Sequence, residues 1–168
     1  KEIENTYKDF HTKAKLTVFH NGARVDLIKF AEKAKYEEAA ICIGKIEIRK
    51  KQASIQHIKN IKFVGPIVDQ RFKKNNDNYL GIWTRNYLYE NLTNYSTLVL
   101  ISNGEAHPLV CCEALIAGLG LVVSEEASAN LDSSLPFINV IKQNSMHRKD
   151  YIYQIIQENI KMSKFYRK

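Results

Sequence analysis

Short apolar runs rich in β-branched residues recur along the chain and are separated by polar stretches that carry glycine, serine and asparagine. Such runs predict strands at 16–19, 39–43, 61–64, 98–101, 121–124 and 137–141. The run 98–101 is apolar at every position. This is typical of a strand that is buried on both faces of a parallel sheet.

The stretches between these runs predict helices at 1–15, 51–58, 84–94, 109–117 and 150–164. Thr84 is a suitable N-cap, and the isoleucines between Ile152 and Ile160 form one face of the last helix. Residues 69–78 and 125–134 have no apolar period and predict surface connections. The fold class is therefore α/β: a Rossmann-like parallel sheet flanked by helices.

Composition indicates a globular domain with a basic surface. The 168 residues are 45% hydrophobic and 26% charged, with a formal net charge of +7. A basic surface favours anionic partners, namely a nucleoside diphosphate, an acidic membrane face or nucleic acid. The lysine-rich side of the helix at 150–164 leaves peripheral membrane contact open as a second role for that helix.

Cysteine usage and hydropathy narrow the cellular setting. Cys42, Cys111 and Cys112 lack metal-ligand spacing, and we expect buried, reduced thiols in the cytoplasm. No apolar run has transmembrane length, and the charged start is not typical of a signal peptide. The sequence also lacks an Asp-x-Asp pair, a Gly-x-Gly-x-x-Gly turn and a Walker loop.

Two glutamates stand out in the stretch 98–124, which predicts a strand, a loop, a helix and a second strand. Glu105 lies on the loop and Glu113 on the helix that follows Pro108. The loop belongs at the carboxyl edge of the sheet, where open α/β folds bind ligands, and the helix terminus favours a phosphate. Because carboxylates repel phosphate, they are better hydroxyl acceptors. A sugar linked to a phosphate satisfies both features.

The run Ser102-x-x-Glu105-x-His-Pro-Leu-Val-x-x-Glu113-Ala-Leu-x-Ala-Gly118 resembles the donor-site signature of retaining GT-B glycosyltransferases of the family 4 type. In that signature two glutamates flank seven residues. The resemblance implies that Glu105 holds the donor sugar and Glu113 the ribose of a nucleotide sugar. It also implies that backbone groups of the intervening residues contact the donor: Ala106, His107, Pro108, Leu109 and Val110.

Two further segments are similar to parts of the same family. Gly44 and Lys45, with Lys50 five residues later, resemble its phosphate loop, although Lys45 replaces the usual arginine. Residues 79–83, which include Ile82, resemble the strand and turn that place backbone groups against the nucleotide base, and Trp83 is a candidate to stack on that base. The resemblance implies catalysis by Glu105, Lys45 and Lys50, with no cofactor and no required metal ion.

The same resemblance predicts the domain organisation. Asn21, Gly22, Asp26 and Phe30 are similar to the passage between the two GT-B domains. Residues 1–35 are then an interdomain linker and domain start, and residues 36–168 the nucleotide-sugar-binding domain. We expect the glycan or lipid acceptor to bind an N-terminal domain outside this chain, and the chain alone to bind nucleotide without transferring sugar.

Two other classes of protein fit parts of the pattern. Another GT-B enzyme, such as a nucleotide-sugar epimerase or a phosphorylase, would share the fold and the donor residues. A basic α/β module that binds nucleic acid would share the charge, and it predicts steeply salt-dependent binding that nucleotide sugar does not compete away. The sequence contains no recognised nucleic-acid motif, so we expect no nucleic-acid partner.

Overall fold

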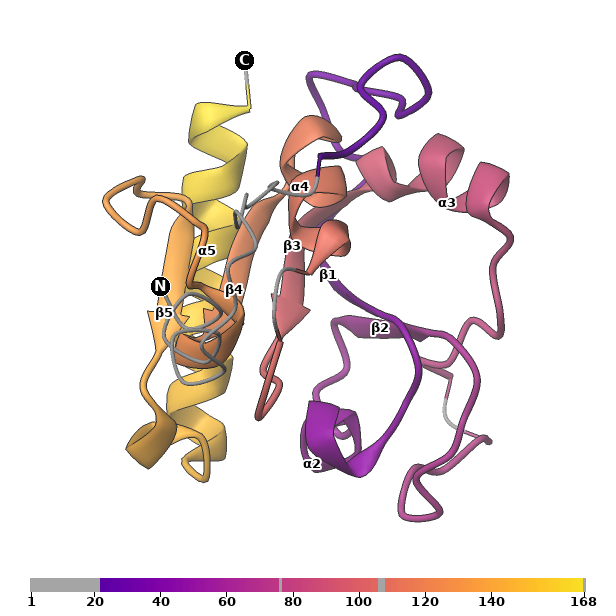
Figure 1. The fold of residues 1–168 in the computed structure, drawn as a ribbon, viewed down its shortest axis with the longest axis vertical. Coiled ribbons are helices and arrows are strands. Elements are labelled where there is room, and N and C mark those ends of the chain that lie inside the picture. The colour runs from indigo at the N-terminus through magenta and orange to yellow at the C-terminus, as the bar shows by residue number, and fades with distance from the viewer. Residues whose placement is uncertain (1–21, 76, 106–107, 168) are drawn as a thin grey trace, which may run out of the picture.

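A computed structural model describes residues 22–75, 77–105 and 108–167 of the chain. Its five strands form one sheet in the order β2-β1-β3-β4-β5, and every pairing is parallel (Figure 1). The strands are Tyr36–Ile43 (β1), Ile61–Val64 (β2), Tyr95–Leu100 (β3), Gly120–Ser124 (β4) and Ile138–Ile141 (β5). The α/β prediction and five of the expected strands are confirmed. The strand expected at 16–19 and the helix at 1–15 lie outside the described residues.

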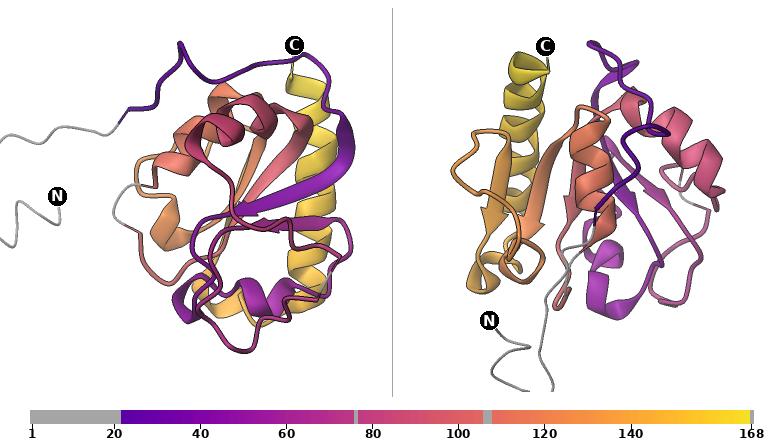
Figure 2. Two further views of the ribbon diagram at one scale, coloured as in Figure 1. Left: turned by 90° about the vertical axis from the view of Figure 1, so that its right-hand side faces the viewer. Right: turned by 45° about the horizontal axis from the view of Figure 1, so that its top comes forward.

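Helices cover both faces of this sheet. They are Gln52–Ile55 (α2), Arg85–Asn91 (α3), Leu109–Ile116 (α4) and Lys149–Tyr166 (α5). Single 3-10 turns at Ile48–Lys50 (η1), Leu92–Asn94 (η2), Glu125–Ala127 (η3) and Gln143–Ser145 (η4) complete the connections. Figure 2 shows α3 and α4 on the side of the sheet opposite α5.

Two apolar cores result from the alternation of side chains along the strands. Cys42 and Val99 face α5 and α2, where they meet Ile55 and Ile156. Their strand neighbours Ile41, Leu98 and Leu100 point the other way and pack with α3 and α4, which contribute Leu88 and Ala114 to the second core. The strands are apolar at consecutive positions because both of their faces are buried.

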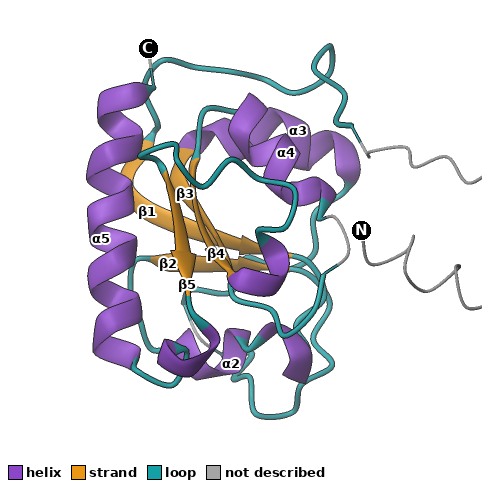
Figure 3. Cartoon of the chain, turned by 60° about the vertical axis from the view of Figure 1, so that its left-hand side comes forward, coloured by secondary structure: helices purple, strands orange, loops and turns teal. Residues whose placement is uncertain are grey.

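The long helix α5 runs along one face of the sheet (Figure 3). The predicted stripe is confirmed, since Ile152, Ile155, Ile156 and Ile160 are all buried. Asn159, fully buried in the same stripe, binds the strands beneath it. None of the helices among the described residues combines the length and apolar character needed to cross a bilayer.

Two local predictions differ from the structure. Residues 79–83 do not form a strand: Tyr79 makes one isolated bridge to Phe63, and Gly81, whose carbonyl accepts from the N–H of Gly65 at 2.9 Å, has φ of +81°. The helix expected at 51–58 is limited to Gln52–Ile55: it begins one residue later, because Lys51 takes a left-handed conformation with φ of 55°, and it ends before Gln56. Pro108 immediately precedes α4, with ψ of 105°, in agreement with the predicted start of that helix at 109.

Candidate functional site

Two strand-end loops meet at the carboxyl edge of the sheet. From β1 the chain continues to β2, toward one edge of the sheet, and from β3 it continues to β4, toward the opposite edge. The crevice between the ends of β1 and β3 is therefore the topological switch point of the fold. The backbone N–H of Asn103 donates to the carbonyl of Arg49 at 2.9 Å, and the Arg49 guanidinium donates to the Ser102 hydroxyl at 3.1 Å. These contacts bind the loop after β1 to the loop after β3.

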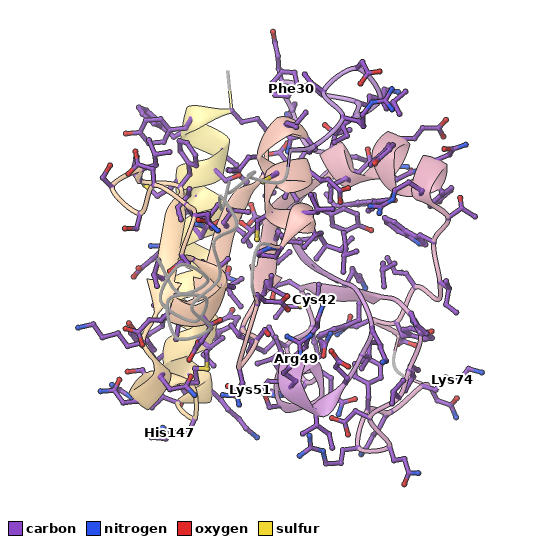
Figure 4. The ribbon with its side chains drawn as sticks, viewed as in Figure 1. Phe30, Cys42, Arg49, Lys51, Lys74 and His147 are labelled. Carbon is purple, nitrogen blue, oxygen red and sulfur yellow. The ribbon has the colours of Figure 1, made fainter. Side chains whose placement is uncertain are left out.

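The carboxylate of Glu105 is the centre of the site. Its Oε1 lies 3.2 Å from Arg49 Nη1 and 3.6 Å from Lys50 Nζ. The side chains of Glu105 and Lys50 are only 14% and 15% exposed, so the pair is sheltered from solvent. Arg49, labelled in Figure 4, belongs to η1, and its guanidinium reaches Ser102 and Gly104 in the loop that follows β3. The structure therefore brings together Glu105 and Lys50, which were predicted to share one site.

Lys45 lies at the margin of this cluster. Its side chain is 55% exposed, and its ammonium is 3.6 Å from a carboxylate oxygen of Glu47. Glu47 also pairs with Arg49 at 2.8 Å. Burial raises the pKa of the Glu47 carboxyl, but the hydrogen bond from Arg49 and the charges of Arg49, Lys45 and Lys50 outweigh it and leave that pKa below its ordinary value.

Sequence reasoning missed Arg49 and Glu47 as site residues. Arg49 contacts Glu105, Glu47 and Ser102, and it also donates to the carbonyl of Gly104. Its position inside the basic run 45–51 was the available signal. Three cations (Lys45, Arg49 and Lys50) thus face two carboxylates (Glu47 and Glu105), which leaves one net positive charge.

Gly44 lets the Lys50 ammonium approach the backbone. Its φ of +124° is a conformation that side chains rarely adopt, and a β-carbon at this position would stand 3.1 Å from Lys50 Nζ. A glycine is therefore required where β1 ends and the basic loop begins. This is the position that the resemblance assigns to the start of the phosphate loop.

Glu113 belongs to a second cluster, on α4. Its side chain is 4% exposed, and Arg85 Nη1 lies 2.7 Å from its Oε1. The Tyr89 hydroxyl lies 3.5 Å from the same oxygen. Arg85 and Tyr89 come from α3, one helical turn apart, and neither was predicted from the sequence. The two glutamates thus have different partners: the phosphate-loop cations for Glu105, and α3 for Glu113.

A hollow of about 210 Å³ opens where β1 and β2 end. Gly44, Ile82, Trp83 and Arg85 are among the residues that line it. Ile82 is 69% exposed, while the Trp83 ring packs edge-on against Tyr87 with centroids 5.1 Å apart. Three of the predicted binding residues, Gly44, Ile82 and Trp83, therefore line one hollow.

The first turn of α4 carries the remaining predicted residues. Pro108 occupies the N-cap position, and Leu109 and Val110 begin the helix. Ala106 and His107 lie outside the described residues. Within the ranges that the structure describes, no three histidine, cysteine, aspartate or glutamate side chains are grouped as ligands for one metal ion.

The sequence matches no protein-family model, and no curated protein is significantly similar to it. Its fold, however, occurs in solved structures. The C-terminal domain of LpcC from Francisella tularensis, a glycosyl transferase group 1 family protein, aligns with a TM-score of 0.63 at 15% identity. The alignment covers 84% of this chain and 93% of that one. The chain has the fold of a GT-B C-terminal domain.

Two longer proteins align with similar scores. Alr3699/HepE of Anabaena, solved in complex with UDP-glucose, gives a TM-score of 0.65 at 12% identity, over 88% of this chain and 50% of that one. Sucrose-phosphate synthase of Thermosynechococcus elongatus aligns with a TM-score of 0.62 at 13% identity, and the alignment covers 96% of this chain and 51% of that one. This chain spans about half the length of either. The predicted fold class is confirmed.

Proposed function

We propose that this chain is the donor-binding part of a retaining glycosyltransferase, which transfers a hexose from a nucleoside diphosphate to a glycan, lipid or other acceptor. The observation that carries the proposal is the position of Glu105 and Lys50. They come from the loops after β3 and β1, and they lie 3.6 Å apart and sheltered at the switch point of the sheet. The likeness to a structure in complex with UDP-glucose supports the same ligand class.

The basic loop is assigned to the diphosphate. Lys50, Lys45 and Arg49 carry the positive charge that a diphosphate needs, and Gly44 keeps the backbone beside it open. Charge-assisted contacts in a sheltered site contribute roughly 1.5–3 kcal/mol each. Glu105 is assigned to the hydroxyls of the sugar. Its ion pairs with Arg49 and Lys50 also keep these cations in place when the site is empty.

The nucleoside is assigned to the hollow beside β1 and β2. Ile82 and Trp83 border the space for a base, and Glu113 on α4 is the acceptor for ribose hydroxyls. The amino end of α4, with Pro108, Leu109 and Val110, faces the diphosphate, and Ala106 and His107 belong to the same loop. Helix dipoles favour negative charge at this end.

In the proposed reaction the leaving nucleoside diphosphate gains negative charge as the bond to the sugar breaks. Lys45, Lys50 and the amino end of α4 stabilise that charge electrostatically, so the proposal requires no metal ion or other cofactor. Residues 1–35 lead from an acceptor-binding domain outside this chain, as in the resembled enzymes. The acceptor and the groups that orient it are assigned to that domain. The protein is assigned to the cytoplasm, where cysteines stay reduced.

A ligand screen tests the donor site. We expect thermal shift and calorimetry to identify one nucleoside diphosphate that binds with a high-micromolar dissociation constant, which corresponds to about 5–6 kcal/mol. Glu105→Gln should weaken binding of the matching nucleotide sugar more than that of the nucleoside diphosphate. Lack of binding by every nucleotide at millimolar concentration would refute the donor site, and competition by duplex DNA or RNA instead would favour a nucleic-acid module.

A further inference from the structure

An ion pair between α3 and α4 controls the environment of Glu113. The glutamate side chain is 4% exposed and the Arg85 side chain is 58% exposed, with 2.7 Å between Oε1 and Nη1. A carboxylate this deeply buried needs a compensating charge. In the described part of the chain, Arg85 is the only cation within 4.0 Å of it.

The side-chain contacts that the described residues make with this carboxylate use the same oxygen. Arg85 Nη1 and the Tyr89 hydroxyl both approach Oε1, at 2.7 and 3.5 Å. The Arg85 guanidinium also lies over the Tyr89 ring, 5.7 Å from its centroid, which limits its orientation. Among the residues that the structure describes, none donates a hydrogen bond to Glu113 Oε2. Within the described ranges, Oε2 thus has no donor that a ligand would need to displace.

Arg85 itself is held at a defined place. It is the first residue of α3, and the Thr84 side chain caps this helix by accepting from the N–H of Tyr87 at 3.3 Å. The same arginine borders the hollow that Gly44, Ile82 and Trp83 line. Arg85 thus links the proposed nucleoside space to the buried carboxylate.

We propose that Arg85 is a positioning residue. By occupying Oε1 it holds Glu113 with Oε2 open to the ribose hydroxyls, and this makes the site selective for ribonucleotides over 2′-deoxyribonucleotides. The inference rests on the proposed function, because it takes Glu113 as the ribose acceptor. Without the guanidinium, the carboxylate loses its compensating charge and its fixed orientation, and the 2′-hydroxyl loses its partner.

Calorimetry with UDP and 2′-deoxy-UDP tests this proposal. If the nucleotide screen identifies another base, the ribonucleotide and 2′-deoxyribonucleotide of that base are used instead. The wild-type protein should bind the ribonucleotide about tenfold more tightly, as expected for one hydrogen bond to a charged group. In Arg85→Met the ratio of the two dissociation constants should fall toward one. Arg85→Lys keeps the charge but loses the planar fork, so its ratio should be intermediate.

Arg71 provides a matched control. It pairs with Asp69 at 2.7 Å, and their side chains are 63% and 2% exposed, which closely resembles the Arg85 pair. Arg71→Met should therefore leave the ribose preference unchanged. Because the readout is a ratio, a general loss of stability does not imitate the expected result.

If a folded Arg85→Met variant binds nucleotides with the wild-type ratio of dissociation constants, the proposed role of Arg85 is wrong. The donor-site proposal is not affected by that result. If this variant does not fold, Arg85→Lys and Tyr89→Phe serve as the test, and an unchanged ratio in both has the same meaning. If the wild-type protein binds no nucleoside diphosphate at all, the donor-site proposal fails and the role of Arg85 fails with it. The two failures are therefore distinguishable.

Discussion

Gly65 lies directly against the carbonyl group of Gly44: a β-carbon built on Gly65 would stand 2.1 Å from the Gly44 carbonyl oxygen. The loop after β2 is thus packed on the first residue of the basic loop after β1. Gly65 has φ of +137°, and its carbonyl accepts a hydrogen bond from the Tyr79 hydroxyl at 2.9 Å. The shape of the proposed diphosphate site therefore depends on a glycine outside it.

Gly65→Ala should destabilise the protein and disturb the donor site. We expect a loss of roughly 2–3 kcal/mol in the free energy of unfolding, because the substitution adds both backbone strain and a clash. Chemical denaturation measures this loss, and calorimetry should show weaker nucleoside diphosphate binding. Gly22→Ala is the control, since a β-carbon there has no neighbour within 4 Å. Equal stability of the two variants would contradict the packing argument.

Lys50 and Lys45 should differ in their contribution to nucleotide binding. Lys50 is 15% exposed and Lys45 is 55% exposed, so solvent screens Lys45 more strongly. Lys50→Met should weaken nucleoside diphosphate binding by about tenfold or more, and Lys45→Met by less. Neither should change nucleoside binding in calorimetry. Lys59→Met, at the opposite end of β2, controls for net charge. An equal loss for nucleoside and nucleoside diphosphate would mean that the lysines support only the loop.

Asn159 should be the most sensitive polar residue of the α5 core. Its side chain accepts from the Thr97 hydroxyl at 2.8 Å and donates to the Leu121 carbonyl at 2.9 Å and to Asn139 at 2.7 Å. Asn159→Ala leaves these buried partners unsatisfied and should cost roughly 2–4 kcal/mol of stability. Urea denaturation measures this loss, and Gln154→Ala, at an exposed position on the same helix, is the control variant. Comparable midpoints for both variants would show that the network contributes little.

The buried thiols should be unreactive in the native protein. Burial raises the pKa of Cys111 to about 12, and it also raises the pKa of Cys42. Both thiols are then protonated near pH 8, where a disulfide reagent requires the thiolate. We expect partly exposed Cys112 to react first, and the other two to react only after addition of denaturant. Rapid modification of all three in the folded protein would show that these thiols are not buried.

The same shifts predict how stability depends on pH. Because the folded pKa of Cys111 lies above its ordinary value of 9.0, the unfolded chain loses this proton first as pH rises. The thiol therefore reduces stability between about pH 9 and pH 12 and has no effect below that range. Replacing Cys111 with serine or alanine should remove this part of the alkaline decline in denaturation experiments.

Local pattern determined which segments become strands and where the strand-end loops of the proposed site begin. The run 98–101 predicted a strand buried on both faces, and β3 is buried throughout. The glutamate motif placed Glu105 on a strand-end loop and Glu113 on a helix, and both are there. Strand and helix positions can be predicted in this way because the apolar periodicity, the turn residues and the helix start signals are all properties of short segments.

Only the tertiary structure decided which charged groups meet. Arg49 contacts Glu105, which is 56 residues away, and Arg85 contacts Glu113, which is 28 residues away. Neither arginine differs in sequence from a solvated surface residue. Their partners depend on the strand order, which places β1 beside β3, and on the packing of α3 with α4 on one face. A buried carboxylate must be compensated by whichever cation the fold brings near it, and that choice is made by long-range packing.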